Sequence, residues 1–303
     1  MLKSKSAINQ SIGERIFSCF NYIFLTLIMF ICIYPFYYVF INSIADSNEA
    51  NQGVLFWPKH VVFVTYTQMF SNGNIPHAFF ISVSRSVVTT ILVCIFTSML
   101  AYLVTQKEMF GRRFVYRFII ITMYIGAGLI PWYLTMKMYH LDDTFLLYVL
   151  PYCLNAYFMI LIKTFIESIP SSLEESASID GAGFFTIFFR IIFPLITPII
   201  ATVAVYQFVN SWNTYMDNYL LTSNSELQTL QLILYHYLNQ AMAMVTQMKA
   251  GNLNSDSSKA IAQISIVSVQ NTITIITVLP IMFVYPFLQK YFTKGLMLGA
   301  IKG

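Results

Sequence analysis

Charge is what this sequence has least of. Of its 303 residues only 10% are Asp, Glu, Lys or Arg, whereas 57% are hydrophobic. A soluble domain carries about 25% charged residues, so this composition cannot build a surface that faces water. The mean hydropathy is +0.66, and several apolar runs are long enough to cross a hydrocarbon core of about 30 Å. The sequence therefore predicts a membrane protein with several spans.

Cysteine and histidine are also scarce, with four of each. The cysteines lie in or beside apolar runs at unrelated spacings, which is typical of small core side chains rather than of disulfides or metal ligands. The histidines fall in predicted loops or at interfaces, so we expect no metal site and no catalytic residue. The pI is near 8.7, but the basic residues are not clustered with aromatic residues. We therefore expect no nucleic-acid partner.

Six apolar runs are predicted to span the membrane: 16–43, 80–105, 117–138, 145–168, 189–213 and 266–292. The first run is too long for the core of a cleavable signal peptide and no small-residue cleavage site follows it. We therefore expect it to remain as a span. This leaves residues 1–15 as an N-terminal segment and residues 299–303 as a C-terminal tail, on either side of a transmembrane domain over 16–298.

The lysines and arginines predict the orientation of these spans. With a cytoplasmic N-terminus, twelve of the 17 basic residues fall inside and five fall outside, in agreement with the positive-inside rule. Both termini are then cytoplasmic, and the segments 44–79 and 214–265 are external. Within the second of these, ELQTLQLILYHYLNQAMAMV alternates apolar and polar residues at helical spacing, which predicts an amphipathic helix.

One short polar stretch, SSLEESASIDGAG over 171–183, interrupts the apolar sequence between the fourth and fifth predicted spans. Ser171 and Ser172 are each followed three positions later by a glutamate, which is the spacing of a capping box. A short helix is therefore predicted to begin near residue 172. We expect Gly181 and Gly183 to end this helix, through a positive φ or a close approach of the backbone.

This stretch resembles the EAA loop of ATP-binding cassette (ABC) importer permeases, in which E-A-A-x-x-D-G-A is followed, nine residues later, by I-x-x-P. The matching positions are Glu175, Ser176, Ala177, Asp180, Gly181, Ala182, Ile191 and Pro194. The departure is Ser176 in place of the first alanine, which exchanges one small side chain for another. The C-terminal YPFLQKYFTKGLMLGAIKG and the region from GAGLIPWYLTMKMY to FIESIP resemble the carbohydrate-uptake branch, particularly permeases for oligosaccharides and polysaccharide fragments.

The resemblance implies an all-α, type I ABC importer permease fold, with six transmembrane helices and a cytoplasmic coupling-helix elbow within the EAA loop, 169–188. In such a permease the elbow docks into a cleft of a separate ATPase subunit. Glu175 would face a basic residue of that subunit, Ala177 and Ala182 would pack in the cleft, and Gly181 would form the bend. The C-terminal tail, with Lys302 and Gly303, would also reach the ATPase.

The partners implied by the resemblance are a second homologous permease, two ATPase subunits, an extracytoplasmic solute-binding protein, an oligosaccharide and the lipid of a bacterial cytoplasmic membrane, which this multi-pass chain would cross. ATP and Mg²⁺ would be held by the ATPase subunits. This chain has no G-x-x-x-x-G-K-[ST] phosphate loop, so we expect it to bind no nucleotide and no other cofactor.

The predicted spans have no Asp or Glu at their centres, which argues against a proton- or sodium-coupled carrier. Arg85 and Lys163 lie near the ends of their spans, where a long side chain can reach the interface. Neutral polar and aromatic side chains remain, and these suit an uncharged ligand rich in hydroxyl groups. The candidate substrate path comprises Tyr124, Asn155, Tyr157, Gln207, Asn210, Ser211, Thr214, Asn271 and Thr274. Hydrogen bonding between helices is the alternative role for each of them.

Two alternatives to an oligosaccharide permease are a membrane-embedded enzyme and a permease for a non-sugar solute. An enzyme embedded in the membrane would need a nucleophile–base pair or a metal set within the spans, and the predicted spans contain neither. An ABC importer permease for a non-sugar solute, such as amino acids or phosphate, would keep the elbow motif but not the C-terminal resemblance. The sequence therefore predicts the permease subunit of an ATP-driven importer for oligosaccharides or polysaccharide fragments. It does not identify the sugar.

Overall fold

The computed structural model of the chain describes residues 12–72, 75–249 and 267–283. In these ranges the regular elements are helices, together with an isolated bridge between Ala45 and Val61. The predicted all-α fold is therefore confirmed. The chain divides into two compact units, one formed by Met1–Thr67 and Ala241–Ile275 and the other by Gln68–Gln240 and Ile276–Gly303.

Unit 1 contains the long helix α1 (Ile12–Ser43), the short helix α2 (Ser47–Gln52), the beginning of α3 (Val64–Asn72) and part of a helix over Val267–Phe283. The helix α1 has 32 residues and is apolar enough to cross a membrane. Its apolar side chains are largely exposed up to Phe40 and its last turn is buried. Such a helix is typical of a span that presents its sides to lipid or to other helices.

The buried end of α1 is fixed by amide and hydroxyl groups. The Asn42 side chain donates to the Val54 carbonyl and accepts from the Val54 N–H, both at 2.9 Å. The hydroxyl of Thr272 donates to the Ser43 carbonyl at 3.3 Å. Near this point the carboxylate of Glu49 accepts a hydrogen bond from His60 and another from a backbone N–H, and these bonds lower the pKa of Glu49. The chain after α1 is therefore folded back against the end of that helix.

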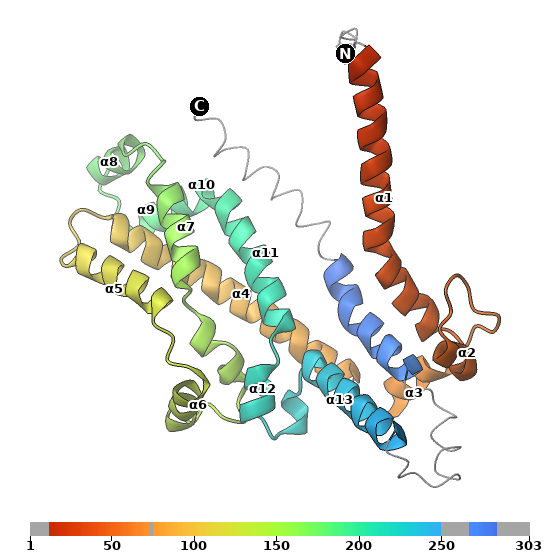
Figure 1. Cartoon of the computed structure of the whole chain (residues 1–303). Helices are drawn as coiled ribbons and strands as arrows, with labels where there is room; N and C mark the ends of the chain where they lie inside the picture. The colour runs from red at the N-terminus through yellow and green to blue at the C-terminus, as the bar shows by residue number, and fades with distance from the viewer. Residues whose placement is uncertain (1–11, 73–74, 250–266, 284–303) are drawn as a thin grey trace. The chain divides into compact units, whose positions relative to one another are not determined.

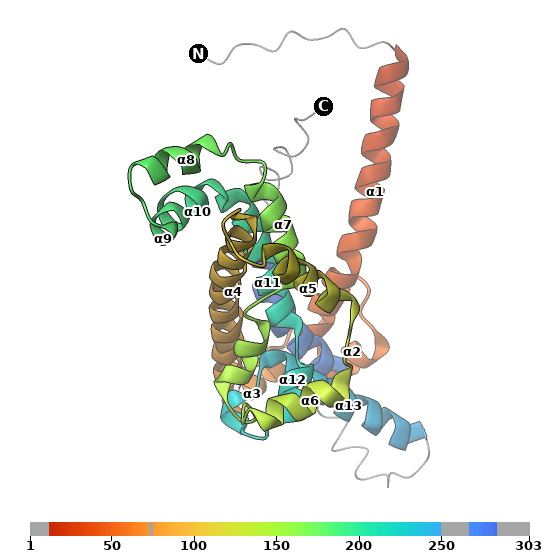
Figure 2. The ribbon, with the colours of Figure 1, turned by 90° about the vertical axis from the view of Figure 1, so that its left-hand side faces the viewer.

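Unit 2 is organised around α4 (Ile75–Thr105), α7 (Ala156–Ile166) and α11 (Thr197–Asn213), which pack along one another (Figure 1). Their shared core includes Val93, Ala101, Met159, Ile162 and Val203, none of which is exposed. Figure 2 shows α8 (Ser172–Ile179), α9 (Phe184–Ile187) and α10 (Phe193–Leu195) together at one end of α4. A π-helical turn, η3 (Phe188–Ile192), joins α9 to α10.

The remaining elements of unit 2 are shorter. They are α5 (Arg112–Tyr124), α6 (Leu129–Met138), the 3-10 turns η1 (Phe145–Tyr148) and η2 (Leu150–Tyr152), α12 (Met216–Leu221), η4 (Ser225–Leu227) and the first half of α13 (Leu230–Lys249). The helix α13 matches the amphipathic helix predicted in this region. The contacts of α12 with α6 and η1, and of η4 with α4, place α6, η1, α12 and η4 at the end of α4 opposite α8 (Figure 1). The helix α5 packs instead against α4 and α7.

Several predicted spans are broken in the structure. The third, 117–138, is not one helix, because α5 ends before Ile125 and α6 begins only after Gly128, whose φ of +84° is left-handed. The fourth consists of 3-10 turns followed by α7, with a bend of 46°. The fifth bends by 79° between Leu195 and Thr197. Gly128 lies at the first of these breaks, and Pro151, Pro194 and Pro198 lie close to the other two. Glycine and proline are the residues that most often interrupt a continuous helix.

Helices α1 and α4 cover the first two predicted spans and begin a few residues earlier than predicted. By length and composition, the described residues contain two helices able to cross a membrane, or up to four if each bent pair forms one span. The sixth predicted span, 266–292, is helical over Val267–Phe283, and the rest of it lies outside the described residues. The tail residues Lys302 and Gly303 also lie outside them.

Candidate functional site

The polar interruption of the sequence forms an elbow, defined here as residues 171–187. The helix α8 begins at Ser172, and Gly181 after it has a φ of +81°. The N–H of Ala182 donates to the Ala177 carbonyl at 3.0 Å, and the N–H of Gly181 donates to the Ser178 carbonyl at 3.1 Å. This is the pattern by which a left-handed glycine ends a helix. The predicted short helix and the turn at Gly181 are both confirmed.

Two details of the predicted elbow are wrong. The Ser171 side chain makes no capping hydrogen bond and its backbone is already helical, so the capping box does not form. The second glycine, Gly183, has a φ of −74° and serves as the N-cap of α9. A Cβ atom added at Gly183 would meet nothing within 4 Å. Neither a positive φ nor a close approach therefore requires glycine at position 183.

The capping box fails because Glu174 is used elsewhere. Its carboxylate accepts a hydrogen bond from the Tyr102 hydroxyl and another from the Gln106 side-chain amide, each at 3.1 Å. Both donors lie at the end of α4 or just after it. A contact between elements has therefore replaced the local cap, and α8 is fastened to α4.

Tyr102 joins three elements of unit 2. Only 1% of its surface is exposed. Besides its bond to Glu174, its ring stacks on Phe184 at 4.9 Å and on Phe188 at 5.5 Å between ring centroids. The elbow is thus connected to α4 by both a hydrogen bond and ring packing. Sequence analysis missed Tyr102. The sequence signal for it was the adjacent pair Glu174 and Glu175, because two neighbouring residues of a short helix point in different directions and one of them can face the rest of the chain.

The other predicted coupling residues differ in exposure. Glu175, Ser176, Asp180, Gly181 and Pro194 are exposed, whereas Ala177 and Ala182 are half-buried against the apolar core of unit 2. Ile179 is 87% exposed at the end of α8. The elbow therefore offers small and acidic side chains on its free surface, together with the exposed apolar side chains of Leu173, Ile179 and Phe185. Its two alanines already contact the chain's own helices.

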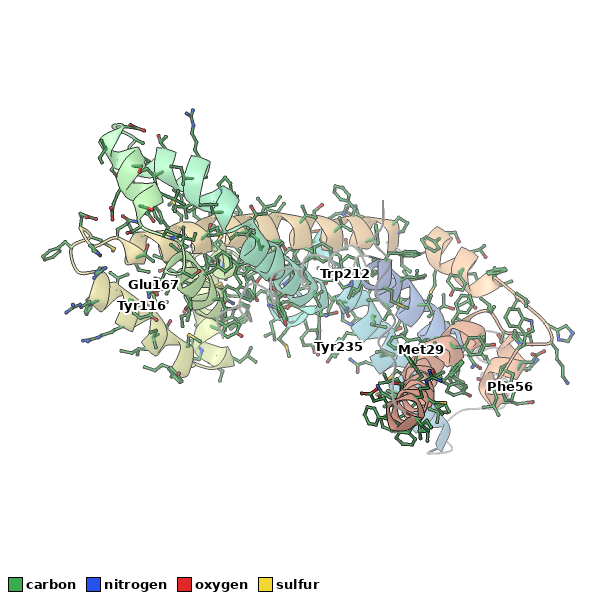
Figure 3. All side chains as sticks on the ribbon, turned by 90° about the horizontal axis from the view of Figure 1, so that it is seen from above. Met29, Phe56, Tyr116, Glu167, Trp212 and Tyr235 are labelled. Carbon is green, nitrogen blue, oxygen red and sulfur yellow. The ribbon has the colours of Figure 1, made fainter. Side chains whose placement is uncertain are left out.

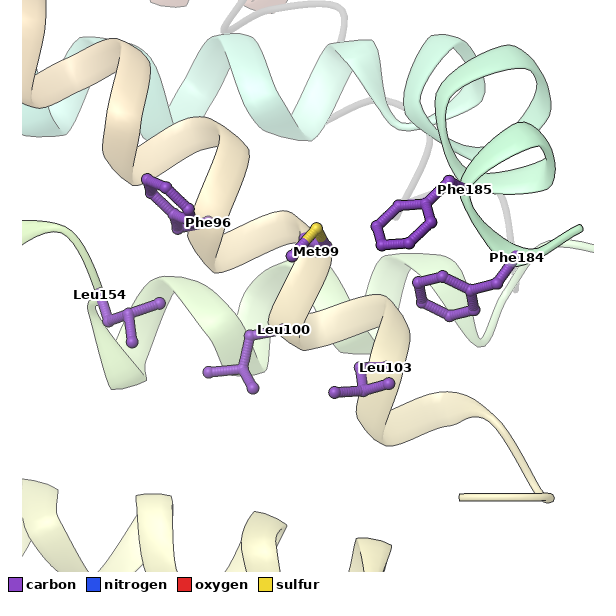
Figure 4. Close-up of a pocket in the computed structure, with 7 residues that line it drawn as sticks. All are labelled: Phe96, Met99, Leu100, Leu103, Leu154, Phe184 and Phe185. Carbon is purple, nitrogen blue, oxygen red and sulfur yellow. The ribbon is translucent and has the colours of Figure 1, made fainter.

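An apolar groove of about 420 Å³ lies beside the elbow (Figure 4). It is lined by Phe96, Met99, Leu100, Leu103, Leu154, Phe184 and Phe185. Because these side chains offer no hydrogen-bonding group, the groove is unsuited to a sugar, whose hydroxyl groups need partners.

The predicted polar stripe on α11 divides into two faces. Gln207 and Ser211 are buried, and the Gln207 amide donates to the Ser211 hydroxyl at 2.9 Å. Asn210 is exposed, and the half-buried Thr214 donates its hydroxyl to the Asn210 carbonyl at 2.8 Å. The first pair is therefore engaged inside unit 2, and of the four residues only Asn210 presents its side chain freely.

The remaining path candidates lie on separate elements. Tyr124 and Tyr157 are 84% and 56% exposed. Asn155 is the N-cap of α7 and accepts from the Phe158 N–H at 3.0 Å. Asn271 and Thr274 belong to unit 1 and are half-buried. A substrate role for these residues stays a prediction.

Unit 2 also contains a buried ion pair that the sequence analysis missed. Arg85 and Asp217 are each 1% exposed. The guanidinium donates to both carboxylate oxygens, at 3.1 and 2.6 Å, and to the Thr214 carbonyl at 3.1 Å. The sequence predicted that Arg85 would extend to the membrane interface. This is wrong, because its guanidinium is paired with Asp217 inside unit 2. Such two-pronged pairing is the strongest geometry available to an arginine and a carboxylate.

Further polar contacts extend this ion pair. The Tyr152 hydroxyl donates to Asp217 at 3.2 Å, and the Arg85 guanidinium lies 4.7 Å from the centre of the Tyr148 ring. The Asn218 amide donates to the Tyr148 hydroxyl, which donates to the Leu227 carbonyl at 2.7 Å. The segment after α11, which the sequence analysis predicted to be external, is thereby fixed to α4 and to the 3-10 turns.

Comparison with known proteins gives a consistent result. Residues 95–297 match the model of a family described as binding-protein-dependent transport system inner membrane component. The chain is 32% identical to the polygalacturonan/rhamnogalacturonan transport system permease protein YtcP of Bacillus subtilis, over 96% of this chain and 99% of that protein. It is 33% identical to protein LplC of the same organism, over 95% and 96% of the two chains.

A solved structure resembles the chain over most of its length. It is described as the crystal structure of a bacterial ABC transporter involved in the import of the acidic polysaccharide alginate. The similarity covers 94% of this chain and 100% of the matched chain, with a TM-score of 0.82 and 27% sequence identity. The helical architecture is therefore shared with a transporter chain.

Proposed function

The chain belongs to the family of binding-protein-dependent transport system inner membrane components, and from this we propose that it is the permease subunit of an ATP-driven importer of oligosaccharides or polysaccharide fragments. The observation that carries the proposal is the exposed elbow, ended at Gly181 and fastened to α4, in a chain of this family. Membership of a transport family is consistent with a chain that is not itself an enzyme.

The proposed coupling runs from the elbow to the helices. The exposed side of α8, with Glu175, Ser176 and Asp180, meets a separate ATPase subunit, and Tyr102 passes its movement to α4. Two such ATPase subunits hold ATP and Mg²⁺, and a second homologous permease completes the path. The tail residues Lys302 and Gly303 are proposed as further ATPase contacts. The excess of basic residues in the predicted inner segments supports a cytoplasmic elbow and cytoplasmic termini.

Oligosaccharides are the proposed substrate class for two reasons. The first reason is the names of two relatives. The name of YtcP refers to polygalacturonan and rhamnogalacturonan. The name of AraQ of Bacillus subtilis, which is 25% identical over 93% of this chain, refers to arabinooligosaccharides. These names favour a sugar over the non-sugar alternative. The second reason is that the predicted path residues carry neutral amide, hydroxyl and aromatic groups, which suit the hydroxyl groups of a sugar. The substrate is delivered by an extracytoplasmic binding protein.

A deletion strain tests the proposal. Loss of this chain should abolish uptake of at least one labelled trisaccharide, from a set that includes trigalacturonate and arabinotriose, and a plasmid copy should restore it. In vesicles, the purified chain alone should neither hydrolyse ATP nor move the sugar. Normal uptake of every oligosaccharide in the deletion strain, with loss of amino-acid or phosphate uptake, would establish the non-sugar alternative instead.

The link between α8 and α4 gives a further prediction. Glu174→Ala removes both hydrogen bonds that fasten α8, and a hydrogen bond to a charged group contributes about 1.5–3 kcal/mol. We expect the stimulation of ATP hydrolysis by loaded binding protein to fall about five-fold or more. Tyr102→Phe keeps the ring stacking and loses one bond, so it should have the smaller effect. The matched control is Glu175→Ala, on the exposed side of α8. Equal effects of Glu174→Ala and Glu175→Ala would contradict the link.

A further inference from the structure

A cluster of aromatic rings lies on α12 and α13 and just before α12, within unit 2. The Tyr215 and Tyr235 rings stack with centroids 4.9 Å apart, and the Tyr219 ring meets the Tyr235 ring edge-on at 5.1 Å. The His236 ring lies 5.9 Å from Tyr235 and 6.2 Å from Tyr219. Tyr235, labelled in Figure 3, therefore contacts all three other rings.

These rings are accessible. Tyr219 is 47% exposed, His236 is exposed, and Tyr215 and Tyr235 are half-buried. Within the described part of the chain, none of the three tyrosine hydroxyls has a hydrogen-bond partner. Buried tyrosine hydroxyls normally find a partner, as those of Tyr148 and Tyr152 do. Among the described residues, the cluster therefore has exposed ring surface and hydroxyl groups that no other side chain engages.

Side-chain amides adjoin the rings. The Gln231 amide donates to the Asn213 side chain at 3.2 Å. Gln231 lies four residues before Tyr235 on α13, so both lie on the same face of that helix. Asn213 ends α11 two residues before Tyr215. The amide pair therefore lies between the end of α11 and the rings.

The amide pair continues a set of exposed residues along α11. Tyr206, Asn210 and Asn213 are all exposed, and their spacing of four and three residues places them on one face of the helix. This face differs from the one that carries the buried Gln207 and Ser211. A line of aromatic and amide groups thus runs along α11 and ends at the ring cluster.

This combination matches the chemistry of a sugar ring. A pyranose has faces of C–H groups, which pack on an aromatic ring as other apolar surface does, and a rim of hydroxyl groups that need hydrogen-bond partners. We propose that Tyr215, Tyr219 and Tyr235, together with the Asn213–Gln231 pair, form a platform that binds one sugar ring of the substrate. From this platform, the exposed residues Asn210 and Tyr206 continue the line of polar and aromatic groups along α11. The proposal rests on the proposed transport of oligosaccharides and names the residues that first hold them.

A different role for exposed tyrosines is anchoring at the boundary between lipid and water. The observations favour sugar binding, because the rings form one contiguous cluster with an amide pair beside it. An anchor needs only separate rings at the right depth. Tyr139, 65% exposed at the end of α6, is such a separate ring and provides a control.

The test is transport by the complete importer in proteoliposomes, with a labelled trisaccharide that the wild-type importer takes up. Tyr219→Ala and Gln231→Ala should each raise the KM for transport, by about ten-fold for the ring and about three-fold for the amide. The maximal rate and the amount of protein in the membrane should change by less than about two-fold. Tyr219 lies at the edge of the cluster, so its loss leaves the stack of Tyr215 on Tyr235 in place. Tyr139→Ala should leave the KM unchanged.

Three outcomes separate the possibilities. A raised KM in the two platform variants, with a normal Tyr139→Ala variant, supports the platform. If the wild-type importer transports the trisaccharide and the KM is unchanged in Tyr219→Ala and Gln231→Ala, the platform is overturned and the proposed function stands. The same conclusion follows if Tyr219→Ala and Tyr139→Ala both lower only the amount of protein in the membrane. Absence of oligosaccharide transport by the wild-type importer overturns the proposed function, and the platform with it.

Discussion

Arg85→Met should lower the free energy of unfolding by about 3–5 kcal/mol, because it leaves the Asp217 carboxylate buried without a cation. The wild-type pair is bidentate and 1% exposed on both sides. A loss of this size is a large part of the stability of a typical domain, which is about 5–15 kcal/mol. We therefore expect little folded protein in the membrane. The measurements are the yield of monodisperse protein in detergent and its thermal unfolding midpoint.

The double variant Arg85→Met/Asp217→Asn is the control. The asparagine oxygen can still accept from the Tyr152 hydroxyl, which donates to Asp217 at 3.2 Å in the native protein. Since both charges are removed together, most of the lost stability should return. Asp217→Asn alone should be destabilising, because Arg85 is then the uncompensated ion. A single Arg85→Met variant with wild-type yield and unfolding midpoint would show that the pair does not hold this region together.

The features that the sequence predicted correctly depend on local signals. Long apolar runs indicate helices whatever their neighbours are, and the helix from Ser172 with its turn at Gly181 is encoded within about a dozen residues. The same local reasoning failed at the capping box. There Glu174 has a choice between the start of its own helix and Tyr102, 72 residues away in the sequence. Glu174 bonds to Tyr102 because that hydroxyl is buried and because Gln106, one turn further along the chain, supplies a second donor.

The features that the sequence analysis missed depend on distant pairs. Arg85 and Asp217 are 132 residues apart, and a positive residue near the end of an apolar run looks the same whether it reaches water or meets an acid. The broken third span was also missed. A hydropathy average passes over Gly126 and Gly128, whereas the backbone at Gly128 leaves the helical region.

The candidate substrate path shows a limit of helical spacing: it predicts which side chains lie close together on a helix, but not which of them are exposed. Gln207, Asn210, Ser211 and Thr214 are close enough on a helical wheel to be taken as one stripe. The core of unit 2 lies across that stripe, so Gln207 and Ser211 are buried while Asn210 is exposed. Which part of a polar stripe faces the core depends on neighbouring helices, and those were not predicted.

Gly181→Val should uncouple ATP hydrolysis from transport more than any single change of charge on the elbow. Gly181 has a φ of +81°, and a Cβ atom there would meet nothing within 4 Å. The cost is therefore backbone strain, of order 1–3 kcal/mol for a residue forced into this region. The turn can relieve that strain by opening, which would redirect α8 away from its partner. We expect a loss of about ten-fold or more in the stimulation of ATP hydrolysis by loaded binding protein.

Two matched variants make this prediction specific. Gly183→Val adds the same side chain two residues later, where the φ of −74° is acceptable to valine and the space is open, so stimulation should stay within about two-fold of wild type. Glu175→Gln removes an exposed charge, and an exposed ion pair contributes only about 0–1 kcal/mol. Its effect should therefore also be small. A severe Glu175→Gln variant beside a normal Gly181→Val variant would mean that charge, rather than the direction set by the glycine turn, transmits the work of the ATPase.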